Sequence, residues 1–364
     1  MRICVVVGTR PEIIKMSPIV REFGKRGVDF FLVHTNQHYS YNMDRIFFEE
    51  LNLPEPDYNL EVGSGRHGVQ TGKMLIEIEK TLLSDRPDLV LVEGDTNTVL
   101  AGALTASKCK IEVGHVEAGL RSFDKSMPEE INRLIADHLS SYLFAPTTVS
   151  KENLVHEGIP EEKIYVVGNT IVDATHHNLR IAEERSSILS DLGLEEGRYF
   201  LLTLHRQENV DDENRLGKIV EALRLVPLSF DMPVIYPIHP RTVKMAERFG
   251  LKARLEENSG IKLIEPVGYL DFLILEKHAA SVLTDSGGVQ EEACILNVPC
   301  ITLRYNTERP ETVQVGKNIV VGIESEDVVN GISEMLGKEL SPANPFGDGN
   351  TGKRIVDILV ASID

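Results

Sequence analysis

Residues 281–293 read SVLTDSGGVQEEA and change from a short β-branched apolar run to a turn of small residues and then to a helix pattern. A continuous run of this kind is typical of a parallel strand that is covered on both faces. In open α/β sheets, ligands bind beyond the carboxyl ends of such strands. The stretch therefore predicts a parallel sheet whose binding residues come directly after its strands.

The same alternation of apolar runs and helix patterns recurs along the chain. The runs lie at residues 3–7, 30–34, 88–94, 111–117, 142–146, 164–168, 199–205, 233–239, 261–266, 281–285, 299–303 and 318–322. Because the rhythm stops and restarts, we predict two doubly wound Rossmann-like domains. We place them at residues 1–168 and 169–345, and we expect a C-terminal helix in 346–364 to cross back onto the first domain.

Composition and charge exclude several classes of function. The 364 residues carry a net charge of -18, whereas binding to nucleic acid needs a basic surface. No stretch approaches the roughly 18 apolar residues of a membrane span. The four cysteines form no CxxC pair, so we interpret them as buried thiols in a reducing compartment and expect a cytoplasmic protein. Zinc-binding motifs such as HExxH are not present.

Three acids in the first half follow predicted strands. Asp95 and Glu117 come directly after apolar runs, and Glu129 lies in the SMPEEINR stretch that follows. Each also has a purely structural interpretation: Asp95 as a helix N-cap, and Glu129 as half of a capping box with Ser126 or of an ion pair with Arg133. Together in one cleft, carboxylates whose pKa values are pushed apart supply both an acid and a base.

The first apolar run ends in GTRPE, residues 8–12. Thr9 and Glu12 have the spacing of a capping box, which predicts a helix start. The capping box does not account for Arg10 and Lys15. Both side chains can reach an anion at the helix N-terminus.

Cationic and small residues follow the strands of the second half. His205 and His239 come after successive apolar runs and suggest a cationic wall for phosphates. The turn Ser286–Gly288 lets a pyrophosphate approach the backbone at a helix N-terminus, although a tight turn without a ligand is the alternative. Glu292, about two turns further along that helix, suits a ribose diol, and Arg309 lies in the TERPE stretch nearby.

The chain resembles the non-hydrolysing UDP-N-acetylglucosamine 2-epimerase family. The matching stretches occur in the family's order: GTRPEIIK (8–15), QH (37–38), GDT (94–96), GHVEAGLRS (114–122), PEEINR (128–133), GNTIVD (168–173), HRQEN (205–209), LTDSGGVQEEA (283–293), TERPE (307–311) and NPFGDGN (344–350). Each is weak alone, but the combination is highly specific. The resemblance implies the GT-B architecture, in which two Rossmann-like domains face each other across a deep cleft, and a homodimer.

The resemblance also implies roles for individual residues. The acid/base residues are Asp95, Glu117, Glu129 and His205. The substrate-binding residues are Arg10, Lys15, Arg133, His239, Phe272, Ser286, Gly287, Gly288, Glu292 and Arg309, with Phe272 beside the uracil. The implied reaction converts UDP-N-acetylglucosamine to UDP-N-acetylmannosamine through expulsion of UDP, a 2-acetamidoglucal and re-addition of UDP, and it needs no metal or other cofactor.

Three other functions compete with this one. A GT-B glycosyltransferase shares the fold and the phosphate turn, because fold does not fix function. A hydrolysing epimerase releases free N-acetylmannosamine and UDP. A sensor binds the nucleotide-sugar without turnover. One departure from the family concerns regulation: bacterial members often carry Gln in an MLDQ-like stretch of an activating site, whereas this chain has Arg45 in NMDR.

The stretch GSGRHG, residues 63–68, matches GxGxxG by spacing alone. It follows PEPDYNLEV, which is not a buried strand, so we predict a loop there and no dinucleotide site.

Overall fold

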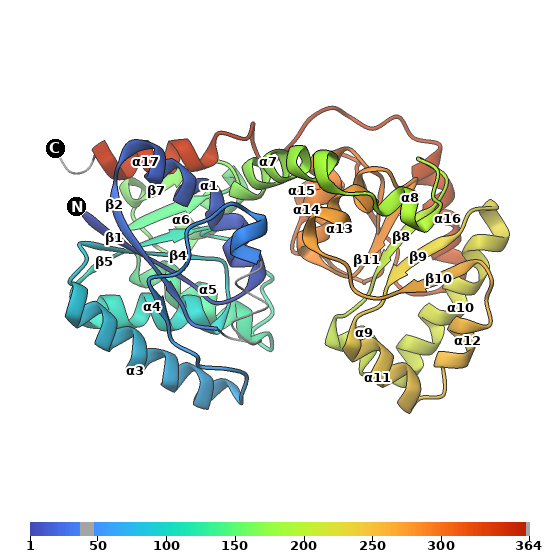
Figure 1. Ribbon diagram of the computed structural model, residues 1–364, viewed down its shortest axis with the longest axis horizontal. Helices are drawn as coiled ribbons and strands as arrows, with labels where there is room; N and C mark the ends of the chain where they lie inside the picture. Colours follow the sequence, from blue (N-terminus) through green and yellow to red (C-terminus); the bar gives the residue numbers. More distant parts are fainter. Residues whose placement is uncertain (37–46, 362–364) are drawn as a thin grey trace. The chain divides into compact units, whose positions relative to one another are not determined.

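The computed structural model describes residues 1–36 and 47–361, and the chain divides into two compact units. Unit 1 comprises Met1–Ala174 and Phe346–Asp364, and unit 2 comprises Thr175–Pro345. The division falls inside one helix, α7 (Thr170–Arg185), which is continuous across it (Figure 1).

Unit 1 contains a fully parallel sheet in the order β3-β2-β1-β4-β5-β6-β7. Its strands are β1 (Arg2–Val7), β2 (Asp29–His34), β3 (Tyr58–Asn59), β4 (Leu89–Glu93), β5 (Glu112–Val116), β6 (Tyr142–Ala145) and β7 (Ile164–Val166). Its helices besides α7 are α1 (Arg10–Arg26), α3 (His67–Asp85), α4 (Asn97–Lys108), α5 (Pro128–Leu139), α6 (Thr148–His156) and α17 (Thr351–Ala361), with a 3₁₀ turn at Glu161–Lys163.

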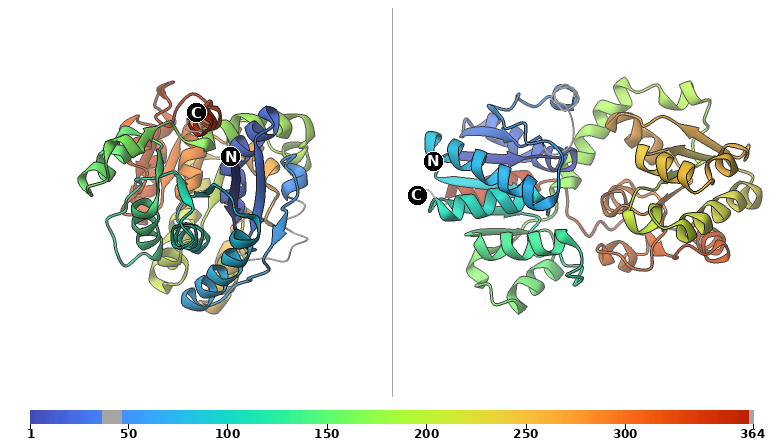
Figure 2. Two further views of the ribbon diagram at one scale, coloured as in Figure 1. Left: turned by 90° about the vertical axis from the view of Figure 1, so that its left-hand side faces the viewer. Right: turned by 90° about the horizontal axis from the view of Figure 1, so that it is seen from below.

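Helices cover both faces of this sheet, so its central strands are almost completely buried (Figures 1 and 2). Helices α3, α4 and α5 pack side by side on one face, and α1 lies on the other beside α17. Helices α1 and α17 approach closely: a Cβ added at Gly352 of α17 would lie 2.8 Å from the Cβ of Pro18 of α1. Arg26 and Asp357 join them by an ion pair of 2.6 Å.

Unit 2 contains a second fully parallel sheet, in the order β10-β9-β8-β11-β12-β13. Its strands are β8 (Phe200–Thr203), β9 (Val234–Pro237), β10 (Ile261–Ile264), β11 (Ser281–Thr284), β12 (Cys300–Thr302) and β13 (Asn318–Val320). Its helices are α8 (Ile188–Leu192), α9 (Gln207–Val210), α10 (Glu213–Phe230), α11 (Pro240–Arg248), α12 (Lys252–Glu256), α13 (Tyr269–Lys277), α14 (Gly287–Leu296), α15 (Pro310–Gln314) and α16 (Ser325–Leu336).

Two apolar cores lie on the two faces of this second sheet. Side chains of α10 and α16 fill one, and side chains of α8, α13 and α14 fill the other. The prediction of two doubly wound parallel sheets is confirmed, and every predicted apolar run overlaps one of the strands. The strand that the sequence pattern missed is β3, which has two half-buried residues at the sheet edge.

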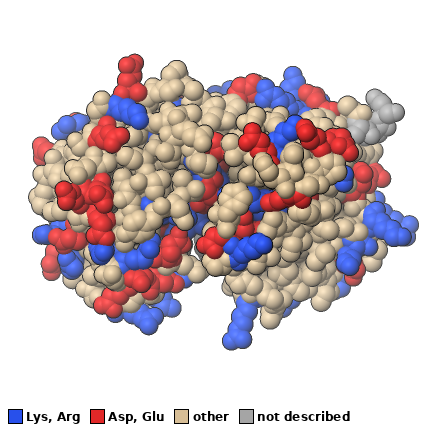
Figure 3. Space-filling view, turned by 180° about the vertical axis from the view of Figure 1, so that it is seen from behind, with Lys and Arg blue, Asp and Glu red and all other residues tan. Residues whose placement is uncertain are grey.

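Some local predictions need correction. The GSGRHG stretch is not all loop, because α3 begins inside it at His67. Three of the four cysteines are buried as expected, but Cys109 is half-exposed. In the described residues no helix is long and apolar enough to cross a membrane. On the face shown in Figure 3, acidic and basic side chains are interspersed and form no broad basic patch.

Candidate active site

The acids of unit 1 lie at the ends of two neighbouring strands. Strands β4 and β5 pair along their whole length, and Glu117 directly follows β5 while Asp95 is two residues beyond β4. Glu117 adopts a left-handed backbone conformation with φ of 69°. For a residue other than glycine this conformation costs roughly 1–3 kcal/mol and is commonly found at functional sites. The fold thus holds the Glu117 carboxylate in a fixed and unfavourable backbone geometry.

Glu117 belongs to a buried group of charges. The Nζ atom of Lys15 lies 2.6 Å from Glu117 Oε1 and 3.5 Å from Glu93 Oε1. Asn169 donates a second hydrogen bond to Glu117 Oε1, at 3.0 Å. Burial, only partly offset by Lys15, raises the pKa of Glu93 well above its usual value. The Lys15 ammonium therefore stands between two buried carboxyl groups, and burial makes that of Glu93 harder to ionise.

Asp95 is held by a second cation. The guanidinium of Arg133 donates to Asp95 Oδ2 at 2.5 Å and to Glu130 Oε2 at 2.8 Å. The side-chain amide of Asn132 donates to the Asp95 carbonyl oxygen at 2.8 Å. The Asp95 side chain remains 32% exposed, so it is both oriented and accessible.

Two structural interpretations of these acids are wrong. Asp95 is not the N-cap of α4, because Thr96 occupies that position and accepts from the Thr98 amide. Ser126 does not cap α5: Met127 is the N-cap, and the Ser126 hydroxyl donates to Asp124 instead. Glu129, half-buried in the first turn of α5, therefore has no capping role with Ser126.

The loop after β1 contains Arg10 and the acid Glu12. Glu12 accepts from the amides of Gly8 and Thr9, as the capping-box spacing predicted, and also from the Thr96 hydroxyl. Burial raises the pKa of Glu12 to about 7. A Cβ at Gly8 would lie 2.1 Å from Thr98 Oγ1, so only glycine fits there. The Arg10 guanidinium lies 5.6 Å from the ring centre of Phe47.

In unit 2, Asp285 organises the loop that carries His205. Its carboxylate is fully buried after β11 and accepts from the backbone amides of His205 and Arg206. The ring centres of His205 and His239 are 6.1 Å apart. Partial burial lowers the pKa of both rings, and Arg241 lowers that of His239 further. The lowered pKa values therefore disfavour the positive charge that the expected cationic wall requires of these two histidines.

The Ser286–Gly288 turn begins α14 as predicted, with Ser286 as N-cap. A Cβ at Gly287 would lie 2.7 Å from Glu308 Oε1, so this position requires glycine. The nearest atom to a Cβ at Gly288 is Ser286 Oγ at 4.0 Å, which leaves that side of the turn open. The turn is thus tightly packed at Gly287 and accessible at Gly288.

Further along α14, Glu292 accepts from the Tyr269 hydroxyl at 2.7 Å. Phe272, one turn after Tyr269 on α13, is half-buried against the core. Glu276 on the same helix is fully buried, and burial together with the charge of Glu292 raises its pKa well above the usual value. The sequence pattern did not single out Tyr269 or Glu276.

Arg309 is buried and engaged by an acid of α14. Its Nε atom lies 2.6 Å from Glu291 Oε1. The neighbouring Glu308 pairs with Arg304 at 2.6 Å and with Arg206 at 3.2 Å. Burial alone would raise the pKa of Glu308, but these arginines lower it to about 2.

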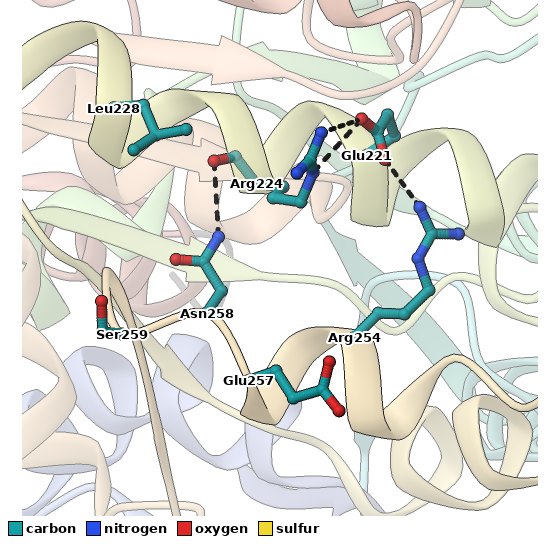
Figure 4. A pocket seen from close by; sticks show the side chains of 7 residues that line it. All are labelled: Glu221, Arg224, Leu228, Arg254, Glu257, Asn258 and Ser259. Atoms are coloured by element: carbon teal, nitrogen blue, oxygen red, sulfur yellow. Dashed lines mark hydrogen bonds and ion pairs between the residues drawn. The ribbon is translucent and has the colours of Figure 1, made fainter.

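A surface hollow of about 460 Å³ on unit 2 contains none of the predicted residues (Figure 4). Arg224 and Arg254 both pair with Glu221 there, so the charges of its lining satisfy one another. It is lined by Glu221, Arg224, Leu228, Arg254, Glu257, Asn258 and Ser259. No group of three or more His, Cys, Asp or Glu side chains suited to a metal ion occurs in residues 1–36 and 47–361. The QH pair at 37–38 and Arg45 lie outside the described residues.

The model of one protein family, described as UDP-N-acetylglucosamine 2-epimerase, matches residues 21–360. The chain belongs to this family. The family assignment confirms the expectation of an isomerase, and the fold is GT-B-like as predicted. A UDP-N-acetylglucosamine 2-epimerase of Methanocaldococcus jannaschii is 62% identical over 361 residues, 99% of each chain.

A crystal structure of this relative and one further relative show the range of the family. The crystal structure of the M. jannaschii epimerase in complex with UDP-GlcNAc and UDP has a TM-score of 0.93 at 61% identity, and the match covers 99% of this chain and 100% of that one. A UDP-2,3-diacetamido-2,3-dideoxy-D-glucuronate 2-epimerase of Pseudomonas aeruginosa is 43% identical over 99% of each chain. The family thus includes epimerases of more than one UDP-sugar.

Proposed function

We propose that this chain interconverts UDP-N-acetylglucosamine and UDP-N-acetylmannosamine. The M. jannaschii relative, at 62% identity, carries the name of this activity, and its structure contains UDP-GlcNAc and UDP. The single observation that supports the proposal best is the pair of acids at neighbouring strand ends, Glu117 bound by Lys15 and Asp95 bound by Arg133. Groups held in this way suit proton transfer at a substrate carbon.

The chemistry of the substrate dictates the order of steps. The hydrogen on carbon 2 of the sugar is not acidic, because no carbonyl group adjoins that carbon in the ring. If the bond between carbon 1 and the diphosphate breaks first, carbon 1 becomes cation-like and a base can remove the carbon-2 proton to give 2-acetamidoglucal and UDP. Protonation of carbon 2 from the opposite face and re-addition of UDP to carbon 1 complete the epimerisation.

The two units divide this work. In unit 1 we assign proton transfer to Asp95, Glu117 and Glu129, while Lys15 and Arg133 orient the acids and Arg10 meets the substrate. In unit 2 we keep His205 as the fourth acid/base residue, placed also to meet the departing diphosphate. The residues assigned to the diphosphate, the ribose and the uracil are His239, Phe272, Ser286, Gly287, Gly288, Glu292 and Arg309. Donors aimed at the developing charge of the leaving group supply the main electrostatic stabilisation.

Proton NMR of the purified protein with UDP-N-acetylglucosamine in heavy water tests the proposal. We expect a UDP-N-acetylmannosamine signal and deuterium on carbon 2 of both sugars. A glycosyltransferase would leave the substrate unchanged without an acceptor, a hydrolysing epimerase would release free N-acetylmannosamine and UDP, and a sensor would bind without turnover. Any of these three results would contradict the proposal. UDP-2,3-diacetamido-2,3-dideoxy-D-glucuronate serves as the competing substrate.

We also propose that the enzyme acts in the cytoplasm as a homodimer. The buried thiols Cys4, Cys294 and Cys300 suit a reducing compartment. Val69, Ile76 and Leu83 form an exposed apolar stripe on α3 at a spacing of seven residues, which suits a contact between copies. Sedimentation of the wild type and of an Ile76→Lys variant tests the dimer, and a monomeric wild type would contradict it.

A further inference from the structure

The imidazole of His115 is completely buried in β5 and makes a short contact through each of its nitrogens. Nδ1 lies 2.6 Å from Asp137 Oδ1 on α5, and Nε2 lies 2.8 Å from the carbonyl oxygen of Gly94. None of these groups belongs to the acid/base set described above. Their position matters, because Gly94 directly precedes Asp95 and His115 is two residues before Glu117.

Hydrogen-bond accounting fixes the protonation of this ring. A carbonyl oxygen can only accept, so the Nε2 atom carries a proton. The other oxygen of Asp137, Oδ2, accepts from Arg121 at 2.7 Å and from the Gly119 amide at 3.2 Å, as expected for an ionised carboxylate. An ionised Asp137 requires a proton on Nδ1 as well, and the ring is then an imidazolium.

The electrostatics of the cluster agree with this assignment. Burial alone would lower the pKa of His115, but Asp137 and the Gly94 carbonyl raise it above its usual value. Burial alone would raise the pKa of Asp137, but His115 and Arg121 lower it. Arg121 is in turn paired with Glu157 at 2.6 Å, which compensates its own charge. Every charge that faces the ring thus has a partner.

The cluster connects the two loops that carry the acids. His115 contacts the residue before Asp95, and Asp137 accepts from the amide of Gly119, two residues after Glu117. A Cβ at Gly119 would lie 2.3 Å from the carbonyl oxygen of Ser150, so this loop has no room to shift toward α6. The buried pair of His115 and Asp137 therefore restrains the backbone close to both Asp95 and Glu117.

We propose that His115, as an imidazolium, and Asp137 are positioning residues that fix the Asp95 and Glu117 loops for proton transfer. The inference rests on the function proposed above. Catalytic groups need to be held within fractions of an ångström by neighbours that are themselves locked in place. A buried ion pair of this kind contributes little net stability compared with apolar packing, so its value here lies in geometry.

The first test is made on the wild-type protein and does not depend on activity. The chain has 11 histidines, and a His115→Asn variant identifies the signals of His115 in a protein labelled with ¹⁵N-histidine. We expect both ring nitrogens of His115 to give imidazolium shifts and attached-proton couplings that do not change between pH 6 and pH 9. A neutral ring, or one that titrates in this range, would overturn the assignment.

The second test separates positioning from folding. His115→Asn keeps a donor near Nδ1, and His115→Gln keeps one near Nε2, so each retains one half of the connection. We expect both to lower kcat per folded molecule by about 10²-fold, because small misplacements at a reacting centre have effects of that size. The Kd for UDP should stay within about twofold, since the diphosphate and ribose contacts are assigned to unit 2. His138→Gln, on the exposed face of α5, is the matched control.

The outcomes are distinguishable from those of the proposed function. A wild-type protein that does not epimerise would refute the proposed function, while the NMR result for His115 would still stand. Variants with wild-type kcat per folded molecule would overturn the positioning role, whatever their thermal stability. If both variants fail to fold, the kcat of Asp137→Asn per folded molecule decides the question.

Discussion

The strand ends of the two units present opposite kinds of chemistry on the same architecture. In unit 1 the loops after β1, β4 and β5 contain charges that are buried and already paired, such as Lys15 with Glu117. In unit 2 the loops after β8 and β9 present histidines with lowered pKa values, and the loop after β11 presents an open glycine turn. The first set is paired within the protein, and we propose that the second gains its charge partner from the bound diphosphate.

The contrast teaches that position after a strand identifies a site but not its electrostatic state. Groups that move protons need fixed partners before the substrate arrives, because reorganisation during the reaction raises the barrier. Groups that bind a diphosphate gain from being neutral beforehand, because an unpaired buried cation is costly. Substitutions in unit 1 should therefore act mainly on kcat, and those in unit 2 mainly on binding.

The largest expected effect comes from the acids of unit 1. Glu117→Gln and Asp95→Asn should each lower kcat by about 10³-fold, the usual contribution of a general acid or base. Because neither acid is assigned to nucleotide binding, the Kd for UDP should be unchanged. Steady-state kinetics and calorimetry measure both quantities. Glu112→Gln, at the exposed start of β5, is the control, and wild-type kcat in both variants would remove the catalytic assignment.

The two glycines of the turn in unit 2 separate packing from ligand approach. Gly287→Ala should destabilise the protein by about 1–3 kcal/mol, because the new methyl group overlaps a buried carboxylate. Gly288→Ala should leave the free energy of unfolding within about 0.5 kcal/mol of wild type. It should nevertheless weaken UDP binding by about tenfold, if the pyrophosphate lies on the open side of the turn. Thermal unfolding and calorimetry measure the pair, and unchanged UDP affinity in Gly288→Ala would contradict the phosphate role.

The protonation of His239 gives a pH test of the same contrast. Its Nδ1 accepts from the Arg241 amide at 3.1 Å, so this nitrogen carries no proton in the free protein. Burial and Arg241 lower its pKa when free, and a bound diphosphate raises it, so binding takes up a proton and weakens as the pH rises. Between pH 6 and pH 8 we expect UDP-N-acetylglucosamine affinity to fall about tenfold, the equivalent of one pKa unit.

Glu117→Gln protein is used for this measurement, so that the substrate is not turned over. In a His239→Asn background the pH dependence should flatten, because asparagine keeps the capping acceptor of α11 but cannot gain a charge. A pH dependence that survives this substitution would assign the proton to another group.

The last effect concerns the pH dependence of stability, not activity or binding, and comes from Glu276. Its raised pKa means that the folded state keeps a proton that the unfolded state loses, so stability falls as the pH rises above the unfolded value near 4.3. Glu276→Gln should remove a pH dependence of the free energy of unfolding of up to about 1.4 kcal/mol per pH unit. The stability of the variant relative to the wild type should therefore increase from pH 5 to pH 8. Thermal melts at both pH values measure this gain. The control Glu326→Gln, at an exposed position, should show the same pH dependence of thermal stability as the wild type. The same dependence in Glu276→Gln would refute a neutral Glu276.

Much of the fold could be predicted because buried parallel strands have a simple signature. Continuous apolar runs mark them directly, whereas β3 has two half-buried residues and leaves no such mark. Helix starts were less certain by one residue, as with Thr96 in place of Asp95 and Met127 in place of Ser126. The backbone geometry decides which of two neighbouring residues is the N-cap, and it can place there a residue such as Met127 that has no capping side chain.

The sequence predicts candidate members of the site but not the electrostatic state of these residues. Glu93 was hidden because it ends an apolar run, and only the fold brings Lys15 and Glu117 to it. The lowered pKa values of His205 and His239 depend on burial, which a sequence pattern does not measure. Glu276 and Tyr269 lie inside a helix and follow no strand, so the rule that located the other residues did not apply to them.

The last helix of the chain completes the first unit to begin synthesis, and this sets the order of folding on the ribosome. Ile355, Val356 and Leu359 of α17 are buried in unit 1, so the part of the first unit that α17 covers stays exposed until this helix has been synthesised. Unit 2 is one continuous stretch, and it is free to fold while its predecessor still waits for that closing segment. A nascent chain that stops after residue 345 would release a finished second half joined to an incomplete first half.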